Sequence, residues 1–143
     1  MKILEVDTEK RRLGNFGERE AEKHLKKKGY RILGRNFDDG EHEIDIIAKN
    51  RDTLAFVEVK TRSEAAKDPR EPRPASAVTP EKQRGLISAA RAYLSLHPSD
   101  LRLRFDIIEV TVSGEADKWK LDKLCHIEGA FNKNTAFRPK YHG

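Results

Sequence analysis

Cysteine is almost absent from this chain of 143 residues, because Cys125 is the only one. A single thiol excludes an internal disulfide and any CxxC zinc or redox motif, and it is typical of a reducing compartment. Long apolar stretches are missing too. The longest stretch without Asp, Glu, Lys or Arg covers residues 92–99, far short of the roughly 20 apolar residues that span a bilayer. We therefore expect no membrane span.

The first residues also lack the features of a secretory signal. The sequence MKILEVDTEKRR has no apolar run after its charges and no small-residue cleavage site, so we expect a cytoplasmic protein. A chain of 143 residues is long enough for one ordinary hydrophobic core but hardly for two. We expect residues 1–131 to form a single domain.

The positive charge is concentrated at the end of the chain. There are 29 Lys and Arg residues against 24 Asp and Glu, a net charge of +5. Three of these five charges belong to a basic tail, residues 132–143, in which Lys133, Arg138 and Lys140 come without an acid. We predict that this tail contacts nucleic acid, with its aromatic residues available to stack on bases. A solvated, disordered tail is the alternative.

Hydrophobic periodicity predicts two helices and four or five strands. The expected elements are a loosely ordered or extended lead-in at 1–13, a helix at 15–28, strands at 30–37, 43–48 and 54–61, a helix at 80–96, a strand at 103–112 and a weaker strand at 124–128. Residues 63–79 are rich in proline and are expected to form a long mobile loop. This order predicts an α/β sandwich in which helices flank a central mixed sheet, with the third strand near its centre.

The second and third strands carry charged residues where a core strand should be apolar. Glu58 and Lys60 are two residues apart and therefore project to the same face. If the loop between the strands has four residues, Leu54 pairs with Lys49. Asp45 then lies opposite Glu58, with their Cβ atoms about 5 Å apart. Such charges are costly to bury unless they are paired or bind a metal.

Two carboxylates at this distance repel each other unless one takes a proton or both share a cation. Oxygen-only ligation by Asp45, Glu58 and a backbone carbonyl, which we assign to Val59, suits Mg²⁺ or Mn²⁺. Lys60 beside the metal would orient or deprotonate the attacking water, or neutralise the charge that develops on phosphorus. These residues together predict metal-dependent phosphodiester hydrolysis.

Each expected helix also places one polar side chain on its apolar stripe. Glu18 comes three residues before Ala21, and Gln83 comes three residues before Leu86. An acid in a first turn is also favoured by the helix dipole, and a polar start to a helix is ordinary. Both interpretations stay open from spacing alone.

Several of these segments resemble a known family. They are Gly17-Glu18, Glu43-Ile44-Asp45, the sequence FVEVKTR at 56–62, Lys82 and Arg104-Phe105-Asp106. Together they are similar to the YraN family of endonuclease-like bacterial proteins, over roughly residues 13–131. That family resembles the PD-(D/E)xK nuclease superfamily and, more distantly, the archaeal Holliday-junction resolvases. The resemblance implies a restriction-endonuclease-like three-layer sandwich, Mg²⁺ dependence and nucleic-acid cleavage, although Ile44 stands where the superfamily pattern has proline.

The resemblance also assigns roles to single residues. Asp45 corresponds to the motif's Asp, Glu58 and Lys60 to its (D/E)xK, and Glu18 to an acid on the first helix that reaches the metal directly or through water. The expected catalytic set is Glu18, Asp45, Glu58, Lys60 and Gln83, the expected metal ligands are Asp45, Glu58, Val59 and Glu18, and the expected nucleic-acid contacts are Arg62, Lys82, Lys133, Arg138 and Lys140. Asp106 is interpreted as a structural partner of Arg104 or Arg102. His42 is interpreted as a strand-edge residue.

We therefore expect a Mg²⁺-dependent nuclease that acts on DNA, with branched and single-stranded DNA among the candidate substrates. A junction resolvase would also need a homodimer with paired sites, because it must cut two strands symmetrically. The alternative is a nucleic-acid-binding module with a nuclease fold and little activity. A third interpretation is an unrelated α/β domain whose strand charges form salt bridges.

Overall fold

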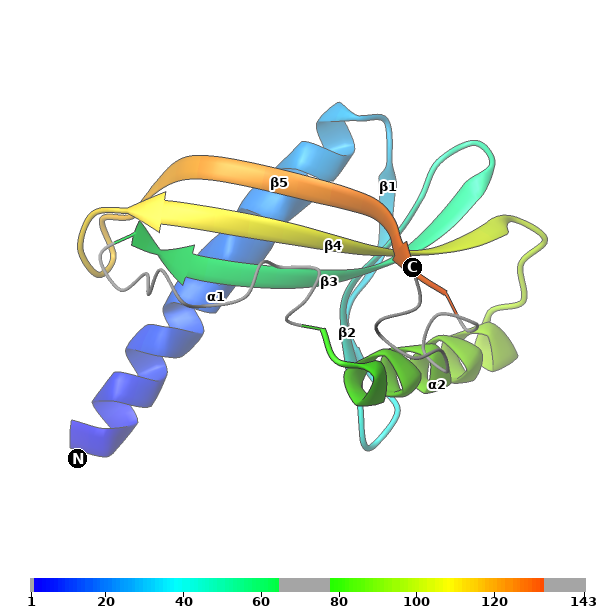
Figure 1. Ribbon diagram of the computed structural model, residues 1–143, viewed down its shortest axis with the longest axis horizontal. Helices are drawn as coiled ribbons and strands as arrows, with labels where there is room; N and C mark the ends of the chain where they lie inside the picture. Colours follow the sequence, from blue (N-terminus) through cyan, green and yellow to red (C-terminus); the bar gives the residue numbers. More distant parts are fainter. Residues whose placement is uncertain (1, 65–77, 133–143) are drawn as a thin grey trace, which may run out of the picture.

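The computed structural model describes residues 2–64 and 78–132, with side chains described from residue 8 onward (Figure 1). The helices and strands are α1 (Lys2–Lys27), β1 (Arg31–Asp38), β2 (Glu43–Lys49), β3 (Thr53–Ser63), α2 (Pro80–Leu96), β4 (Arg102–Ser113) and β5 (Lys120–Phe131). The proline-rich loop at 65–77 and the basic tail from residue 133 lie outside the described residues.

The five strands form one mixed sheet in the order β1-β2-β3-β4-β5, so β3 is the central strand, as predicted. The first three strands form an antiparallel meander, β3 and β4 are parallel, and β4 and β5 are antiparallel. Parallel neighbours need a long crossover connection. Here the crossover contains α2, which is why one helix comes between β3 and β4.

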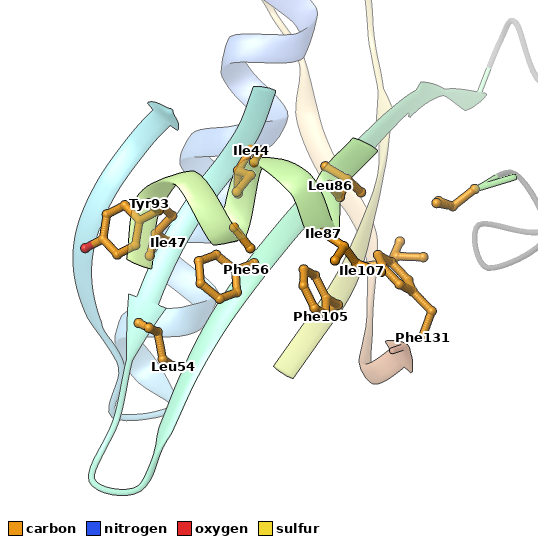
Figure 2. Close-up of a cluster of buried hydrophobic side chains, with 13 residues drawn as sticks. Ile44, Ile47, Leu54, Phe56, Leu86, Ile87, Tyr93, Phe105, Ile107 and Phe131 are labelled. Atoms are coloured by element: carbon orange, nitrogen blue, oxygen red, sulfur yellow. The ribbon is translucent and has the colours of Figure 1, made fainter. Parts of the chain in front are cut away.

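Each face of the sheet is covered by one helix, which confirms the predicted α/β sandwich. Side chains alternate along β3: Ala55, Val57 and Val59 belong to the core beneath α1, while Leu54 and Phe56 belong to the core beneath α2. The α2 core is rich in aromatic rings (Figure 2). Phe105 stacks on Phe56, with ring centroids 5.4 Å apart, and on Phe131, with centroids 5.0 Å apart. Both faces of β3 are therefore buried.

The first helix is longer than predicted. The expected lead-in at 1–13 is wrong, because α1 already begins at Lys2. Residues 2–13 contain no proline or glycine and are rich in good helix formers. Residues 8–12 are exposed, and the start of α1 extends beyond the edge of the sheet (Figure 1). Residues 8–12, which are exposed, have no apolar stripe that periodicity could detect.

Asp106 on β4 is fully buried in a structural network, which agrees with its interpretation as a partner of Arg104. Its carboxylate accepts two hydrogen bonds of 2.8 Å from Arg104 and one of 3.0 Å from the Gly129 N–H, and it lies 2.8 Å from His126 Nε2. Burial alone would raise the pKa of Asp106. The contacts with His126 and Arg104 outweigh this and hold the pKa at about 2.

No helix in the described segments combines the length and the apolar character needed to cross a membrane.

Candidate active site

The site begins where β2 and β3 part. Their ladder runs from Lys49 paired with Leu54, as predicted, to Ile46 paired with Val57. Beyond that pair, Asp45 Oδ2 accepts a hydrogen bond of 2.8 Å from the backbone N–H of Val59. A side chain thus satisfies a strand N–H where the ladder with β2 has ended. This contact fixes the Asp45 carboxylate against β3.

Asp45 and Glu58 lie on the same face of the sheet, as predicted. Glu58 is in phase with Phe56 of the α2 core, and Asp45 lines the same cavity as Glu58. Ile44 and Ile47 both belong to the α2 core, so β2 does not alternate regularly around Asp45. The two acids line one cavity of about 170 Å³, whose wall consists of Glu41, His42, Glu43, Asp45, Glu58, Lys82 and Leu86. The cavity therefore gathers residues from β2, the turn before it, β3 and α2.

Glu58 is only 6% exposed and is flanked by two lysines. Its Oε2 atom lies 3.5 Å from Lys60 Nζ and 3.4 Å from Lys82 Nζ. Lys60 comes from the same strand, and Lys82 comes from the first turn of α2. The Thr79 cap and Pro80 fix the start of that helix, with Thr79 Oγ1 accepting the Lys82 N–H at 3.1 Å. Two independent elements thus supply positive charge to one buried carboxylate.

Glu18 reaches the other side of this acidic cluster from α1. Asn36 donates from Nδ2 to Glu18 Oε1 at 3.3 Å and to Glu43 Oε1 at 3.5 Å, and so bridges two acids. Asn36 has a φ of 50°, in the left-handed region that Asn tolerates better than most residues. Burial, followed by the charges of Glu43 and Glu58, raises the pKa of Glu18 although the Asn36 hydrogen bond opposes this rise.

Gly17 explains why α1 comes so close to β3. A Cβ atom at this position would lie 1.8 Å from Thr61 Oγ1, so only glycine fits between the helix and the strand. Glu18 is the next residue along the helix. The close approach of α1 to β3 therefore determines where the Glu18 carboxylate lies relative to the acids of the sheet.

The surroundings of Asp45 raise the pKa of its carboxyl group. Burial is the largest cause of this rise, and the charge of Glu58 is the second, with smaller contributions from Glu18 and Glu43. Together they raise the pKa of Asp45 to about 8, although the hydrogen bond from Val59 opposes the rise. The direction of this shift favours the protonated form of Asp45 when no cation is bound.

This raised pKa predicts that Asp45 destabilises the apo fold at alkaline pH. The folded state binds more protons than the unfolded state between about pH 4 and pH 8, so stability falls as the pH rises through this window. Asp45→Asn keeps an acceptor for the Val59 N–H but carries no charge. We expect it to match the parent near pH 4 and to be more stable by about 2 kcal/mol at pH 8, a figure reduced for solvent access.

Urea unfolding in EDTA at pH 4.5 and pH 8 measures this difference. A gain in the free energy of unfolding that is the same at both pH values would show that the effect is packing and not ionisation.

The donor chemistry of the site fits a hard divalent cation in part. The carboxylates of Asp45, Glu58, Glu18 and Glu43 offer only oxygen, which Mg²⁺ and Mn²⁺ prefer. Burial first and the charge of Glu58 second raise the pKa of Asp45, and a bound cation would oppose both by favouring the ionised carboxylate. Within residues 2–64 and 78–132, however, no three His, Cys, Asp or Glu side chains are arranged to hold a metal ion together. Two protein carboxylates and several waters are the ligand set that fits.

The other predicted site residues lie at varying distances from this cluster. Gln83 donates from Nε2 to the Val78 carbonyl at 2.9 Å, and its Oε1 is buried with no hydrogen-bond partner. Arg62 forms an ion pair of 2.9 Å with Glu109 on β4. Val59 contributes its N–H to Asp45, as described above. Lys133, Arg138 and Lys140 lie outside the described residues.

Sequence reasoning missed Asn36, and it gave Glu43 no role. A motif search could have flagged Glu43, because it is the first residue of the Glu43-Ile44-Asp45 segment. Nothing in the sequence around Asn36 suggested that its side chain would connect β1 to α1.

The mixed sheet lies between two helices, and two acids and a lysine gather where β2 and β3 separate. This arrangement is consistent with a nuclease-like α/β sandwich. The chain belongs to the uncharacterised protein family UPF0102, whose family model matches residues 17–110. The resemblance to the YraN family that the motifs indicated is thereby confirmed.

Relatives from several bacteria carry the same family description. A protein of Chlorobium phaeobacteroides strain BS1 is 48% identical over 124 residues, which cover 83% of this chain and 93% of the relative. A protein of Chlorobium limicola is 39% identical over 132 residues, with coverages of 91% and 99%. One from Phocaeicola vulgatus is 43% identical over 118 residues, with coverages of 82% and 90%. The chain thus spans nearly the whole length of these relatives.

Proposed function

We propose that this protein is a Mg²⁺-dependent nuclease that hydrolyses phosphodiester bonds in DNA. The observation that carries the proposal is the arrangement of Asp45, Glu58 and Lys60. The two carboxylates line one cavity together with Lys82 and Leu86 of α2, and the Lys60 ammonium group lies 3.5 Å from Glu58 Oε2. Buried acids left in excess are costly to a fold, so their presence together is better explained by chemistry than by stability.

Asp45 and Glu58 would hold the ion, with the Val59 carbonyl as a further oxygen ligand and Glu18 reaching it through water. When bound, such an ion supplies Lewis-acid polarisation of phosphate oxygens and lowers the pKa of a water molecule. In hydrolysis, the attacking water gives up one proton as its oxygen bonds to phosphorus, the bond from phosphorus to one sugar oxygen breaks, and that sugar oxygen takes up a proton. Lys60 and Lys82 stabilise the negative charge that develops on the phosphoryl oxygens.

One observation favours a second candidate, a nucleic-acid-binding module with little activity. Both lysines already lie beside Glu58, and the described residues offer no three-ligand metal group. In this candidate the lysines neutralise Glu58 permanently and the cavity binds a phosphate without cutting it. The two candidates differ in a single measurable property, turnover in the presence of Mg²⁺.

A cleavage assay tests the proposal. Linear, flapped and four-way DNA substrates and a matched RNA would be incubated with the purified protein in Mg²⁺, Mn²⁺ or EDTA. We expect metal-dependent cuts in DNA that EDTA stops. Binding without cuts in either metal would establish the binding module instead. Symmetric cuts in the four-way substrate would further require a homodimer, which sedimentation of the free protein would reveal.

The basic tail supplies a prediction about affinity. Each phosphate contact that is lost flattens the plot of log affinity against log salt concentration by about 0.7 to 0.9. Replacing Lys133, Arg138 and Lys140 by glutamine should therefore reduce the slope by up to about 2 to 3, while leaving the cavity intact. Fluorescence anisotropy with a labelled oligonucleotide at several salt concentrations measures the slope. An unchanged slope would show that the tail is solvated and does not contact the nucleic acid.

A further inference from the structure

His42 lies in a rigid turn that ends at the acidic cavity. Asp39 Oδ1 accepts the backbone N–H groups of Glu41, at 2.8 Å, and His42, at 2.7 Å. The Asp39 N–H in turn donates to the His42 carbonyl at 3.1 Å. His42 also lines the cavity that contains Asp45 and Glu58. Its backbone is therefore fixed at the mouth of the site.

The ring of His42 is held from the other side by α2. A Cβ atom at Gly85 would lie 2.3 Å from His42 Cδ2, so the ring occupies the space that any other residue would fill. Glycine is unfavourable in the middle of a helix. The close approach of the imidazole explains why a glycine is present at this position of α2.

The two ring nitrogens have different surroundings. Nδ1 is buried, forms no hydrogen bond, and lies 3.6 Å from Asp39 Oδ2. Hydrogen bonds from the backbone of Glu41 and His42 lower the pKa of Asp39, so its carboxylate is charged at neutral pH. A carboxylate beside Nδ1 favours the tautomer with its proton on that nitrogen, because a lone pair there would be repelled. The lone pair of the neutral ring is then on Nε2.

Nε2 is the less buried of the two ring nitrogens. It lies on the side of the ring next to α2, 2.8 Å from where a Cβ atom at Gly85 would be. The His42 side chain is nevertheless 37% exposed, and Nε2, unlike Nδ1, is not a buried atom without a hydrogen-bond partner. Three other acids of the cavity wall already have partners: the Asp45 carboxylate accepts from the Val59 N–H, Glu58 lies between two lysines, and Glu43 accepts from Asn36. Glu41 also lines the cavity, from the same turn as His42. With the proton on Nδ1, Nε2 is thus an available nitrogen acceptor at the cavity wall.

We propose that His42 Nε2 accepts a hydrogen bond from the attacking water and so positions that water for the phosphodiester at the cavity. This inference rests on the proposed nuclease function. Asp39 orients the ring, and Gly85 makes room for it. His42 is therefore a water-positioning residue of the site, in contrast to its interpretation from the sequence as a solvated strand-edge residue.

The tautomer is measured first, without metal or substrate. Long-range ¹⁵N–¹H spectra of the labelled protein at neutral pH should show His42 protonated on Nδ1 and bare on Nε2. Asp39→Asn should increase the fraction protonated on Nε2. A parent ring that is protonated mainly on Nε2 would overturn the inference, since that nitrogen could then not accept.

Kinetics provide the second test, with a flapped DNA oligonucleotide as substrate. His42→Ala should lower the single-turnover rate in Mg²⁺ by about 10², within the range of a positioned acid or base. Gly85→Ala, which keeps the imidazole but forces the ring to move, should also slow the reaction. His97→Ala and Gly14→Ala are the matched controls: His97 is exposed at the far end of α2, and a Cβ at Gly14 would meet nothing within 4 Å. Both controls should cut like the parent.

Two further readouts separate positioning from a structural role. The affinity of His42→Ala for the same oligonucleotide in Ca²⁺ should stay within about twofold of the parent, and added imidazole should restore part of the rate of His42→Gly. Parental cleavage by His42→Ala, or a loss of affinity in place of a loss of rate, would overturn the inference and leave the nuclease proposal standing. A parent protein that cuts nothing in Mg²⁺ would overturn both.

Discussion

Replacing Asp45 with alanine is expected to abolish both Mg²⁺ binding and DNA cleavage. The Asp45 carboxylate is fixed by the Val59 N–H where β2 and β3 part, and it shares its cavity with Glu58. Glu58 is already flanked by Lys60 and Lys82, so it cannot replace the missing charge alone. We expect a loss in single-turnover rate of at least about 10³, the upper end of the range for one lost electrostatic stabiliser.

The measurement pairs calorimetric titration of Mn²⁺ with single-turnover cleavage in Mg²⁺. Asp122→Ala is the control, because Asp122 is exposed on β5 and far along the chain from the site. A variant at Asp45 that still bound the ion but cut slowly would assign ligation to other acids. Because Asp45→Asn is also expected to stabilise the apo protein at pH 8, loss of activity together with a gain in stability would separate a catalytic role from simple unfolding.

The second large effect is expected at Lys60. Its ammonium group is held on β3, 3.5 Å from Glu58 Oε2, so it cannot swing far toward a distant phosphate. Lys60→Met keeps most of the stem and the strand packing while it removes the charge. We expect the single-turnover rate in Mg²⁺ to fall by about 10² to 10³, because one stabiliser of the phosphoryl transition state is lost.

DNA affinity of Lys60→Met, measured in Ca²⁺, should change far less than the rate. Lys82 remains 3.4 Å from Glu58 Oε2 and still neutralises it, so the fold and both carboxylates should survive the substitution. Lys123→Met on the exposed β5 strand serves as the matched control. If Lys60→Met cut as fast as the parent, Lys60 would be a salt-bridge partner of Glu58 and nothing more.

Much of the fold follows from periodicity in the sequence. The expected strands at 30–37, 43–48 and 54–61 and the helix at 80–96 agree with β1, β2, β3 and α2 to within two residues at each end. The weaker fifth strand was predicted at 124–128, but β5 covers Lys120–Phe131. It is an edge strand with many exposed residues, and register shifts interrupt its pairing with β4. Regular alternation is therefore weak along most of its length.

The candidate site, like the fold, could be predicted only in part. The shared face of Asp45 and Glu58 could be predicted because strand alternation and a short loop determine which residues meet across a hairpin. The bridge from Asn36 to Glu18 and Glu43 depends on a left-handed backbone and on the packing of α1 against the sheet. The position of the His42 ring depends on a contact with Gly85, 43 residues away in the chain. Neither has a local sequence pattern.

The order of strands also bears on how the chain folds. Asp45 and Glu58 lie on a hairpin closed by residues 50–52, whereas β4 can join β3 only after the crossover through α2 has closed. Contacts that are local in sequence form before those that need a long loop to close. We therefore expect the two acids to meet early, before Lys82 on α2 arrives. Repulsion between the two carboxylates would destabilise the hairpin at that stage. The apolar pairs nearer the turn, such as Ile46 with Val57 and Ile47 with Phe56, would have to stabilise it.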